Sequence, residues 1–344
     1  MHSMKIAIAG SVFPPNKHGG VSASSFNLYK ALQNRGIMVH VFLAADNKHA
    51  YDDTNITHIW FPEKILNFVL GNGLRILLKT RGNRGGASQL TGVIIGVLRF
   101  WRIRQFINRF NPDILIIPDH DLTNLVPLKS SHYKTVWVSH HNPMRFVNEP
   151  LIDNDASVMD AQLAVALQQK SLARVDGVIC PSLYMKEVFM KTYRFNGQVK
   201  VIPNIVDSDY IASVPKVDLH SQYNLCSNTP IIYIPSAGQH IKGSYFVFEL
   251  IRRIAIIYGK QIAFFLSESI GNYLKRILSF APSNVRLIMP GHIAYKDNIG
   301  YVKGCTICLS HTLLESFSLA QHEAQFCGLP VVTFNVGGNA EIID

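Results

Sequence analysis

The chain has 344 residues, of which 48% are hydrophobic and 16% charged, and its formal net charge is +10 at pH 7. This length suits two domains that each bury a core, and the ordinary apolar content excludes a largely disordered chain. No window approaches the roughly 18 apolar residues that a membrane-spanning helix needs. Five cysteines, an odd number, argue against a disulfide framework and indicate a reducing compartment.

Short apolar runs, which predict buried strands, alternate along the chain with segments whose apolar residues recur at helical spacing. This alternation indicates βα units and parallel sheets. In the first half, we expect strands at 5–10, 39–44, 113–117, 134–139, 177–180 and 198–202, and helices at 22–35, 158–174 and after Ser182. In the second half, we expect strands at 231–234, 262–266, 285–288, 305–309 and 330–334, and helices from Ser244 and after Ser318.

Two further features of the chain follow from residue types. The polar, turn-rich stretch 203–228 is interpreted as a linker between two domains. Cys305 and Cys308 form a C-x-x-C without a second pair, and on a strand they would face opposite sides, so we expect two core thiols and no metal site.

The positive charge is concentrated between Phe61 and Phe110, where nine basic residues accompany one acid, Glu63, for a local charge of +8. Aromatic and aliphatic residues are interleaved with them. This mixture fits an interfacial surface on anionic lipid, and it fits equally a solvated face around a buried stripe. No nucleic-acid motif accompanies the charge, so nucleic acid is not expected as a partner. The basic residues are Lys64, Arg75, Lys79, Arg81, Arg84, Arg99, Arg102, Arg104 and Arg109.

The last part of the chain places two carboxylates around a predicted helix N-terminus. Glu315 lies in the loop between the strand 305–309 and the helix after Ser318, and Glu323 follows eight positions later, inside the helix. Unpaired backbone N–H groups and the macrodipole favour an anion at such a terminus. A ligand that is anionic in the middle and hydroxylated at both ends, such as a sugar nucleotide, fits this arrangement.

This run resembles the Glu-x7-Glu signature of retaining glycosyltransferases with two facing Rossmann-like domains (the GT-B type), in particular family four. The resemblance extends over nearly the whole chain, through Met4-Lys-Ile-Ala-Ile8, Phe13-Pro-Pro, Val201-Ile-Pro-Asn204 and Lys242-Gly243. It implies an α/β fold with an acceptor-side domain at 1–206, a nucleotide-sugar-binding domain at 207–344, and an active site in the cleft between them. It also implies that further strand and helix would follow Asp344, so the C-terminal end is expected to be truncated.

The resemblance assigns roles in the second domain. Glu315 would bind hydroxyl groups of the donor sugar, and Glu323 would bind the nucleotide ribose. Lys242 would stabilise the leaving diphosphate together with backbone amides of the helix N-terminus. The family usually has an arginine five positions before this lysine, where the chain has Ala237; His240 is a candidate for partial compensation. The amides belong to Phe317, Ser318 and Leu319.

In the first domain, the paired glycines Gly19 and Gly20 precede a helix and would let the backbone approach the donor diphosphate and the acceptor. His141, at the end of the strand 134–139, matches the family's histidine near the donor sugar. His140 would face the opposite side of that strand. Asp119 and Asp121 resemble the Asp-x-Asp pair of metal-dependent enzymes, but we interpret them as loop acids.

The resemblance therefore implies a retaining hexosyl-type glycosyltransferase that needs neither metal nor cofactor. Its acceptor would be a glycan or a lipid-linked saccharide in cell-surface polysaccharide assembly, such as that of lipopolysaccharide. We expect a cytoplasmic protein, peripheral on the inner face of the membrane. Two alternatives remain: a nucleotide-sugar epimerase of the same architecture, and an inactive member that binds a membrane or a partner, as Ala237 and the expected truncation suggest.

Overall fold

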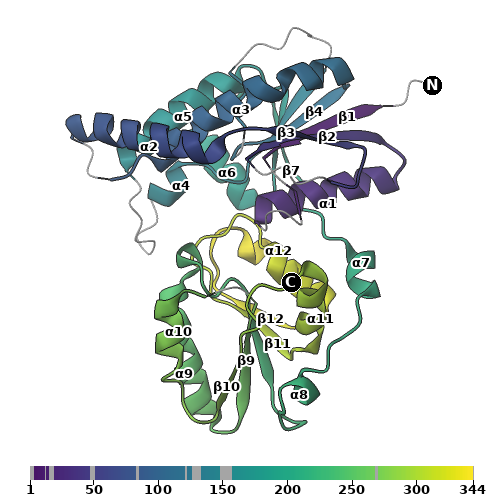
Figure 1. Ribbon diagram of the computed structural model, residues 1–344, viewed down its shortest axis with the longest axis vertical. Coiled ribbons are helices and arrows are strands. Elements are labelled where there is room, and N and C mark those ends of the chain that lie inside the picture. Colours follow the sequence, from purple (N-terminus) through teal and green to yellow (C-terminus); the bar gives the residue numbers. More distant parts are fainter. Residues whose placement is uncertain are drawn as a thin grey trace. The chain divides into compact units, whose positions relative to one another are not determined.

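The computed structural model describes residues 4–11, 13–14, 19–46, 51–82, 85–120, 122–125, 133–147, 157–267 and 270–343. The chain divides into two compact units, unit 1 at Met1–Ile205 and unit 2 at Val206–Asp344. Figure 1 draws unit 1 in purple to teal and unit 2 in green to yellow. The division lies one residue before the boundary expected from the sequence. Asp121 falls outside the described residues.

Unit 1 contains a parallel sheet of seven described strands in the order β3-β2-β1-β4-β5-β6-β7. The strands are β1 (Lys5–Gly10), β2 (Met38–Ala45), β3 (Ile56–Trp60), β4 (Ile114–Pro118), β5 (Lys134–Val138), β6 (Gly177–Cys180) and β7 (Gln198–Val201). The helices are α1 (Gly20–Asn34), α2 (Glu63–Thr80), α3 (Ser88–Phe110), α4 (Met144–Val147), α5 (Val158–Leu172) and α6 (Leu183–Thr192).

Alternate residues of the inner strand β1 face two different apolar cores, as the period of a strand requires. Ile8 packs in the core that includes Tyr29 of α1. Ala9 packs in the other core, which includes Phe100 of α3. Helices therefore cover both faces of the sheet, and its strand ends carry the loops.

Unit 2 contains a parallel sheet of five described strands in the order β10-β9-β8-β11-β12. The strands are β8 (Ile231–Ile234), β9 (Ile262–Leu266), β10 (Val285–Ile288), β11 (Ile307–Ser310) and β12 (Val331–Thr333). The helices are α7 (Ser208–Ser213), α8 (Leu219–Gln222), α9 (Val247–Tyr258), α10 (Asn272–Leu278), α11 (Tyr295–Gly304) and α12 (Leu319–Phe326), with 3-10 turns η1 (His240–Lys242), η2 (Ser244–Phe246) and η3 (Gly337–Glu341).

The same alternation builds the two cores of unit 2. Ile234 packs with Ile251 of α9 on one face of the sheet. Tyr233 packs with Ala324 of α12 on the other. Both sheets are thus open, parallel and covered on two faces, which confirms the expected α/β class.

The predicted strands at 5–10, 177–180, 231–234, 262–266 and 285–288 are confirmed residue for residue. The linker prediction was wrong in part, because the stretch 203–228 contains the short helices α7 and α8, capped by the side chains of Asp207 and Asp218. The placement of Cys305 on a strand was also wrong. It follows α11, ahead of β11, and packs in the same core as Cys308, so the two thiols do not face opposite sides.

In the described part of the chain, no helix combines the length and the apolar character that crossing a bilayer requires.

Candidate functional site

The strand order of each sheet marks where a ligand is expected. Open parallel sheets bind ligands beyond the carboxyl ends of their strands, where neighbouring connections leave in opposite directions. In unit 2 this switch lies between β8 and β11, because β9 and β10 follow on one side of β8 and β11 and β12 on the other. The loop after β8 carries Lys242, and the loop after β11 carries Glu315.

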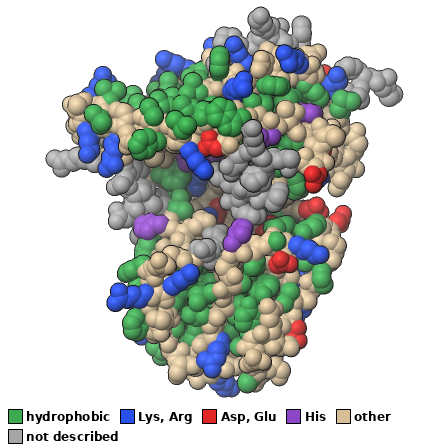
Figure 2. All heavy atoms as spheres, in the orientation of Figure 1, with side chains coloured by type: hydrophobic (Ala, Val, Ile, Leu, Met, Phe, Trp, Pro, Cys, Tyr) green, Lys and Arg blue, Asp and Glu red, His purple; other side chains and the backbone are tan. Residues whose placement is uncertain are grey.

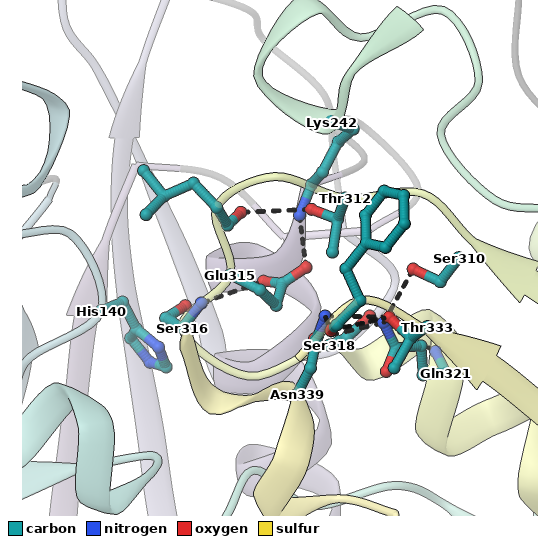
Figure 3. Close-up of polar contacts among 12 residues, drawn as sticks. His140, Lys242, Ser310, Thr312, Glu315, Ser316, Ser318, Gln321, Thr333 and Asn339 are labelled. Carbon is teal, nitrogen blue, oxygen red and sulfur yellow. Dashed lines mark hydrogen bonds and ion pairs between the residues drawn. The ribbon is translucent and has the colours of Figure 1, made fainter. Parts of the chain in front are cut away.

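At this edge the Lys242 Nζ forms an ion pair with the Glu315 Oε2 (Figure 3). The carboxylate is nearly buried, with Glu315 8% exposed. Gly243 lets the two loops approach each other, because it has a φ of +83° and a Cβ added there would lie 3.1 Å from the carbonyl oxygen of His311. The structure thus brings together the cation and the first carboxylate that the sequence singled out.

The backbone of Glu315 is held from the far side by the paired glycines of the η3 turn. The Gly338 N–H donates a hydrogen bond of 3.1 Å to the Glu315 carbonyl oxygen. Gly337 has a φ of +55°, and a Cβ added there would overlap that same carbonyl oxygen. Gly337 therefore has a local physical reason, because only a residue without a side chain fits against the Glu315 loop at that position.

A buried polar network frames the same loop (Figure 3). Gln321 of α12 is fully buried, and its Nε2 lies 2.7 Å from the Ser310 Oγ, 3.2 Å from the Thr333 Oγ1 and 3.2 Å from the Asn339 Oδ1. The Asn339 amide in turn donates to the Phe334 carbonyl at 3.2 Å. These bonds connect the ends of β11 and β12 to α12 and η3, and they therefore hold in place the segments that flank the Glu315 loop.

The N-terminus of α12 faces this loop with its backbone. The helix begins directly after Ser318, as predicted, and the Ser318 side chain caps it by accepting from the Gln321 N–H. The side chains of Phe317 and Leu319 are buried. Because these side chains point into the protein, only the backbone N–H groups of these positions are left to bind a ligand. The first N–H groups of a helix have no partner within the helix.

Glu323 lies further along α12 and has a partner that the sequence did not reveal. The Tyr295 hydroxyl donates to its Oε1 at 2.8 Å, and the Tyr295 ring stacks on Tyr210, with centroids 5.7 Å apart and planes 12° from parallel. Burial raises the pKa of Glu323 to about 7, against the lowering effect of that hydrogen bond.

The position of the missing arginine is closed to solvent. Ala237 is fully buried and belongs to the apolar core beside β8. His240 is exposed, and its ring lies 5.3 Å from that of Tyr245. The compensation expected of His240 stays a prediction.

His311 is a feature of this edge that the sequence analysis missed. It is 1% exposed, and within the described ranges neither ring nitrogen has a hydrogen-bond partner. Burial, with a contribution from Lys242, lowers its pKa to about 4, so the imidazole is neutral at pH 7. A buried polar group without a partner costs stability, which makes this histidine conspicuous beside the ion pair.

In unit 1 the switch lies between β1 and β4. Gly19 and Gly20 end the loop after β1, and both are exposed, with nothing within 4 Å of a Cβ added at either. Gly19 is in an extended conformation and caps α1. Among the described residues of unit 1, therefore, local packing gives no reason for this glycine pair, and their ligand role stays a prediction.

Asp119, at the end of β4, is a structural acid. It is buried and accepts hydrogen bonds from the N–H groups of His140 at 2.9 Å and His141 at 3.0 Å and from the Ser139 hydroxyl at 3.1 Å. These bonds tie the loop after β5 to the end of β4. Among the described residues, no group of three or more acids, histidines and cysteines is arranged to hold a metal ion.

His140 and His141 follow β5 instead of lying on it, because the strand ends at Val138. The strand argument that placed them on opposite faces was therefore wrong. His140 is buried. The Nε2 of His141 lies 2.8 Å from the Gln89 Oε1, and burial holds the pKa of His141 well below its ordinary value.

Comparisons with known proteins agree with this geometry. The family model described as Glycosyltransferase Family 4 matches residues 18–210, more than half of the chain, and the model described as Glycosyl transferases group 1 matches residues 252–344. No curated protein matches the sequence.

Several solved structures share the fold. Sucrose-phosphate synthase from Thermosynechococcus elongatus has a TM-score of 0.70 at 18% identity, over 97% of this chain and 82% of its own. HepE of Anabaena, in complex with UDP and glucose, has a TM-score of 0.63 at 15% identity, over 99% of this chain and 83% of its own. WaaG, a glycosyltransferase involved in lipopolysaccharide biosynthesis, has a TM-score of 0.64 at 12% identity, over 98% of this chain and 83% of its own. The chain belongs to glycosyltransferase family 4, a family of retaining, nucleotide-sugar-dependent enzymes with the GT-B fold.

Proposed function

We propose that this glycosyltransferase uses the loop edge of unit 2 to hold the nucleotide-sugar donor and passes the sugar, with retention, to a glycan or lipid-linked acceptor in cell-surface polysaccharide assembly. The observation that carries the donor site is the Lys242–Glu315 ion pair at the topological switch of the second sheet. It sets a cation and a hydroxyl-binding carboxylate side by side, where ligands of such sheets bind.

Each group at this edge has a chemical part in the proposal. The ammonium of Lys242 and the N–H groups at the start of α12 stabilise the negative charge that grows on the leaving diphosphate. Glu315 accepts hydrogen bonds from hydroxyl groups of the donor sugar, and Glu323 from the ribose. For unit 1, the proposal assigns His141 to the donor sugar, and Gly19 and Gly20 to the diphosphate and the acceptor.

The donor proposed for the first test is UDP-glucose, because HepE, which shares the fold, was solved in complex with it. Isothermal titration of the full chain with UDP and with UDP-glucose tests the site. We expect Glu323→Gln to weaken both ligands alike, since both carry the ribose, and Glu315→Gln to reduce mainly the advantage of UDP-glucose over UDP.

The matched control is Glu249→Gln. Glu249 lies on α9 of the same unit and is paired with Arg252 and Arg253 on an exposed face, so the same change there should leave both affinities as they are. The site assignment fails if Glu315→Gln and Glu323→Gln bind both ligands like the unaltered chain.

A second part of the proposal concerns where the enzyme works: unit 1 docks on an anionic bilayer through α2. This helix is apolar on two sides. Leu66 and Leu70 pack inward against the core. On the outward side, Phe68 is 73% exposed and Ile65 64% exposed. Val69 and Ile76 continue that exposed apolar face.

Contiguous apolar side chains on the outward side of a helix are normally covered by another surface, and the outward side of α2 has no such cover among the described residues. Figure 2 shows hydrophobic side chains gathered over this region, with basic ones beside them. Lys64, Arg75 and Lys79 are exposed on the same helix. Arg99 is not part of this charge, because it is buried and lies 2.8 Å from Glu63. The combination of exposed apolar and basic residues favours anionic lipid over an uncharged partner.

Vesicle sedimentation tests the docking. Each basic residue near an anionic surface contributes on the order of 1 kcal/mol, so we expect reversible binding to anionic vesicles that weakens as salt rises. Phe68→Ser should reduce it. Ile257→Ser is the control, because Ile257 is an 85% exposed aliphatic residue in unit 2. Equal binding to neutral and anionic vesicles, or none at low salt, contradicts the docking proposal.

A further inference from the structure

We propose that Gln89 is a positioning residue for His141. It fixes the tautomer and orientation of the imidazole, so that the Nδ1 atom remains a hydrogen-bond acceptor for a hydroxyl group of the ligand. The part of this inference that concerns the ligand rests on the proposed function; the part that concerns the ring does not.

The contact that carries the inference joins two segments 52 residues apart in the chain. The Gln89 Oε1 lies 2.8 Å from the His141 Nε2. An amide oxygen only accepts, so the hydrogen of this bond belongs to the ring, and Nε2 is the protonated nitrogen. In a neutral imidazole the other nitrogen is then an acceptor.

Gln89 is itself anchored. It is the second residue of α3, and its N–H and that of Leu90 each donate to the carboxylate of Asp160, both at 2.9 Å. Asp160 is fully buried on α5. A carboxylate on the first N–H groups of a helix satisfies donors that have no partner within the helix. The start of α3, and with it Gln89, is thereby fixed with respect to α5.

The rest of His141 is constrained as well. Its ring centroid lies 4.5 Å from that of His120 and 4.6 Å from that of Phe146. Its N–H donates to Asp119, and its carbonyl oxygen accepts from the Arg145 Nη1 at 3.3 Å. Within the described ranges, Nδ1 is the polar atom of this residue that has no partner.

The charge state agrees with this geometry. Burial holds the pKa of His141 well below its ordinary value, and its electrostatic interactions with His120 and Arg145 act in the same direction. The ring is therefore neutral at pH 7, and a neutral ring has two tautomers. Without Gln89 the proton would be shared between the nitrogens, and in part of the molecules Nδ1 would carry a hydrogen and could not accept.

Long-range proton–nitrogen correlation spectra of the full chain, with ¹⁵N in the imidazoles, read the tautomer directly, and His141→Gln identifies the signals of His141. We expect an Nε2-protonated ring in the unaltered chain, a mixture in Gln89→Leu, and recovery in Gln89→Glu, whose carboxylate also accepts from Nε2. Gln105→Leu is the control, because Gln105 is an exposed residue of the same helix.

Steady-state kinetics test whether the tautomer of His141 matters for the ligand. With a transferable donor, kcat/KM should fall about tenfold in Gln89→Leu, the loss of one hydrogen bond, and return in Gln89→Glu. A ring protonated at Nδ1 in the unaltered chain, or a tautomer unchanged in Gln89→Leu, overturns the positioning role. A changed tautomer with unchanged kinetics overturns the role toward the ligand. If no donor binds at all, the proposed function fails while the spectra still decide the role of Gln89.

Discussion

Replacing Gly337 by alanine tests whether the η3 turn holds the Glu315 loop in place. The substitution has two separate costs. A left-handed backbone costs a residue with a side chain about 1–2 kcal/mol, and Gly337 has a φ of +55°. In addition, the new methyl group would overlap the Glu315 carbonyl oxygen, so the loop has to move.

Gly328→Ala separates these two costs. Gly328 lies in the same unit, just beyond α12, and has a φ of +84° with nothing within 4 Å of an added Cβ. It should therefore lose only the backbone cost of about 1–2 kcal/mol. The excess destabilisation of Gly337→Ala over Gly328→Ala then measures the overlap with Glu315.

The chain allows each unit to be followed separately. Its three tryptophans are Trp60, Trp101 and Trp137, all in unit 1. Their fluorescence during urea unfolding should be the same in both variants. Hydrogen exchange of the amides of α12 and β12 reports unit 2, and we expect faster exchange in Gly337→Ala than in Gly328→Ala. We also expect weaker UDP-glucose binding only in Gly337→Ala. Equal exchange in the two variants, with binding retained, would refute the reasoning.

Three further outcomes follow from the site. His311→Leu should raise the melting temperature in calorimetry, because it removes a buried imidazole whose nitrogens have no partner among the described residues; a lower value contradicts this. Glu323→Gln should become progressively more stable than the unaltered chain as pH rises from about 5 to 8. The raised pKa of about 7 means that the folded state favours the protonated Glu323, so the unaltered chain loses stability as this carboxyl ionises. A difference in unfolding free energy that stays constant with pH argues against this. Transfer activity should survive EDTA, and a loss restored by manganese or magnesium would overturn the metal-independent mechanism.

The sequence was most informative where a local pattern decides the structure. Strands such as β8 and β9 are short apolar runs between polar residues, and burial on both faces leaves them little freedom. The cap of α12 at Ser318 is likewise a local signal. The short helices α7 and α8 have too few residues to show a period, although Asp207 and Asp218 were available as capping signals.

Contacts between distant segments could not be predicted in this way. Gln89 reaches His141 because α3 begins beside the loop after β5, and no pattern within either segment records that pairing. The same holds for Tyr295, which donates to Glu323 from another helix. A lone glutamine or tyrosine has many ordinary surface roles, so these residues become meaningful only when the fold brings their partners to them.

For the proposed donor site, we expect the pairing of Lys242 with Glu315 to disfavour the binding of simple anions. An anion that takes the lysine ammonium must displace the carboxylate already there, and that carboxylate is nearly buried. Inorganic phosphate or chloride brings no group to satisfy it, so such an exchange leaves a charge uncompensated. A molecule with hydroxyl groups next to its phosphate compensates both members of the pair at once. We therefore expect the ion pair to favour the proposed nucleotide-sugar donor over simple anions such as inorganic phosphate or chloride.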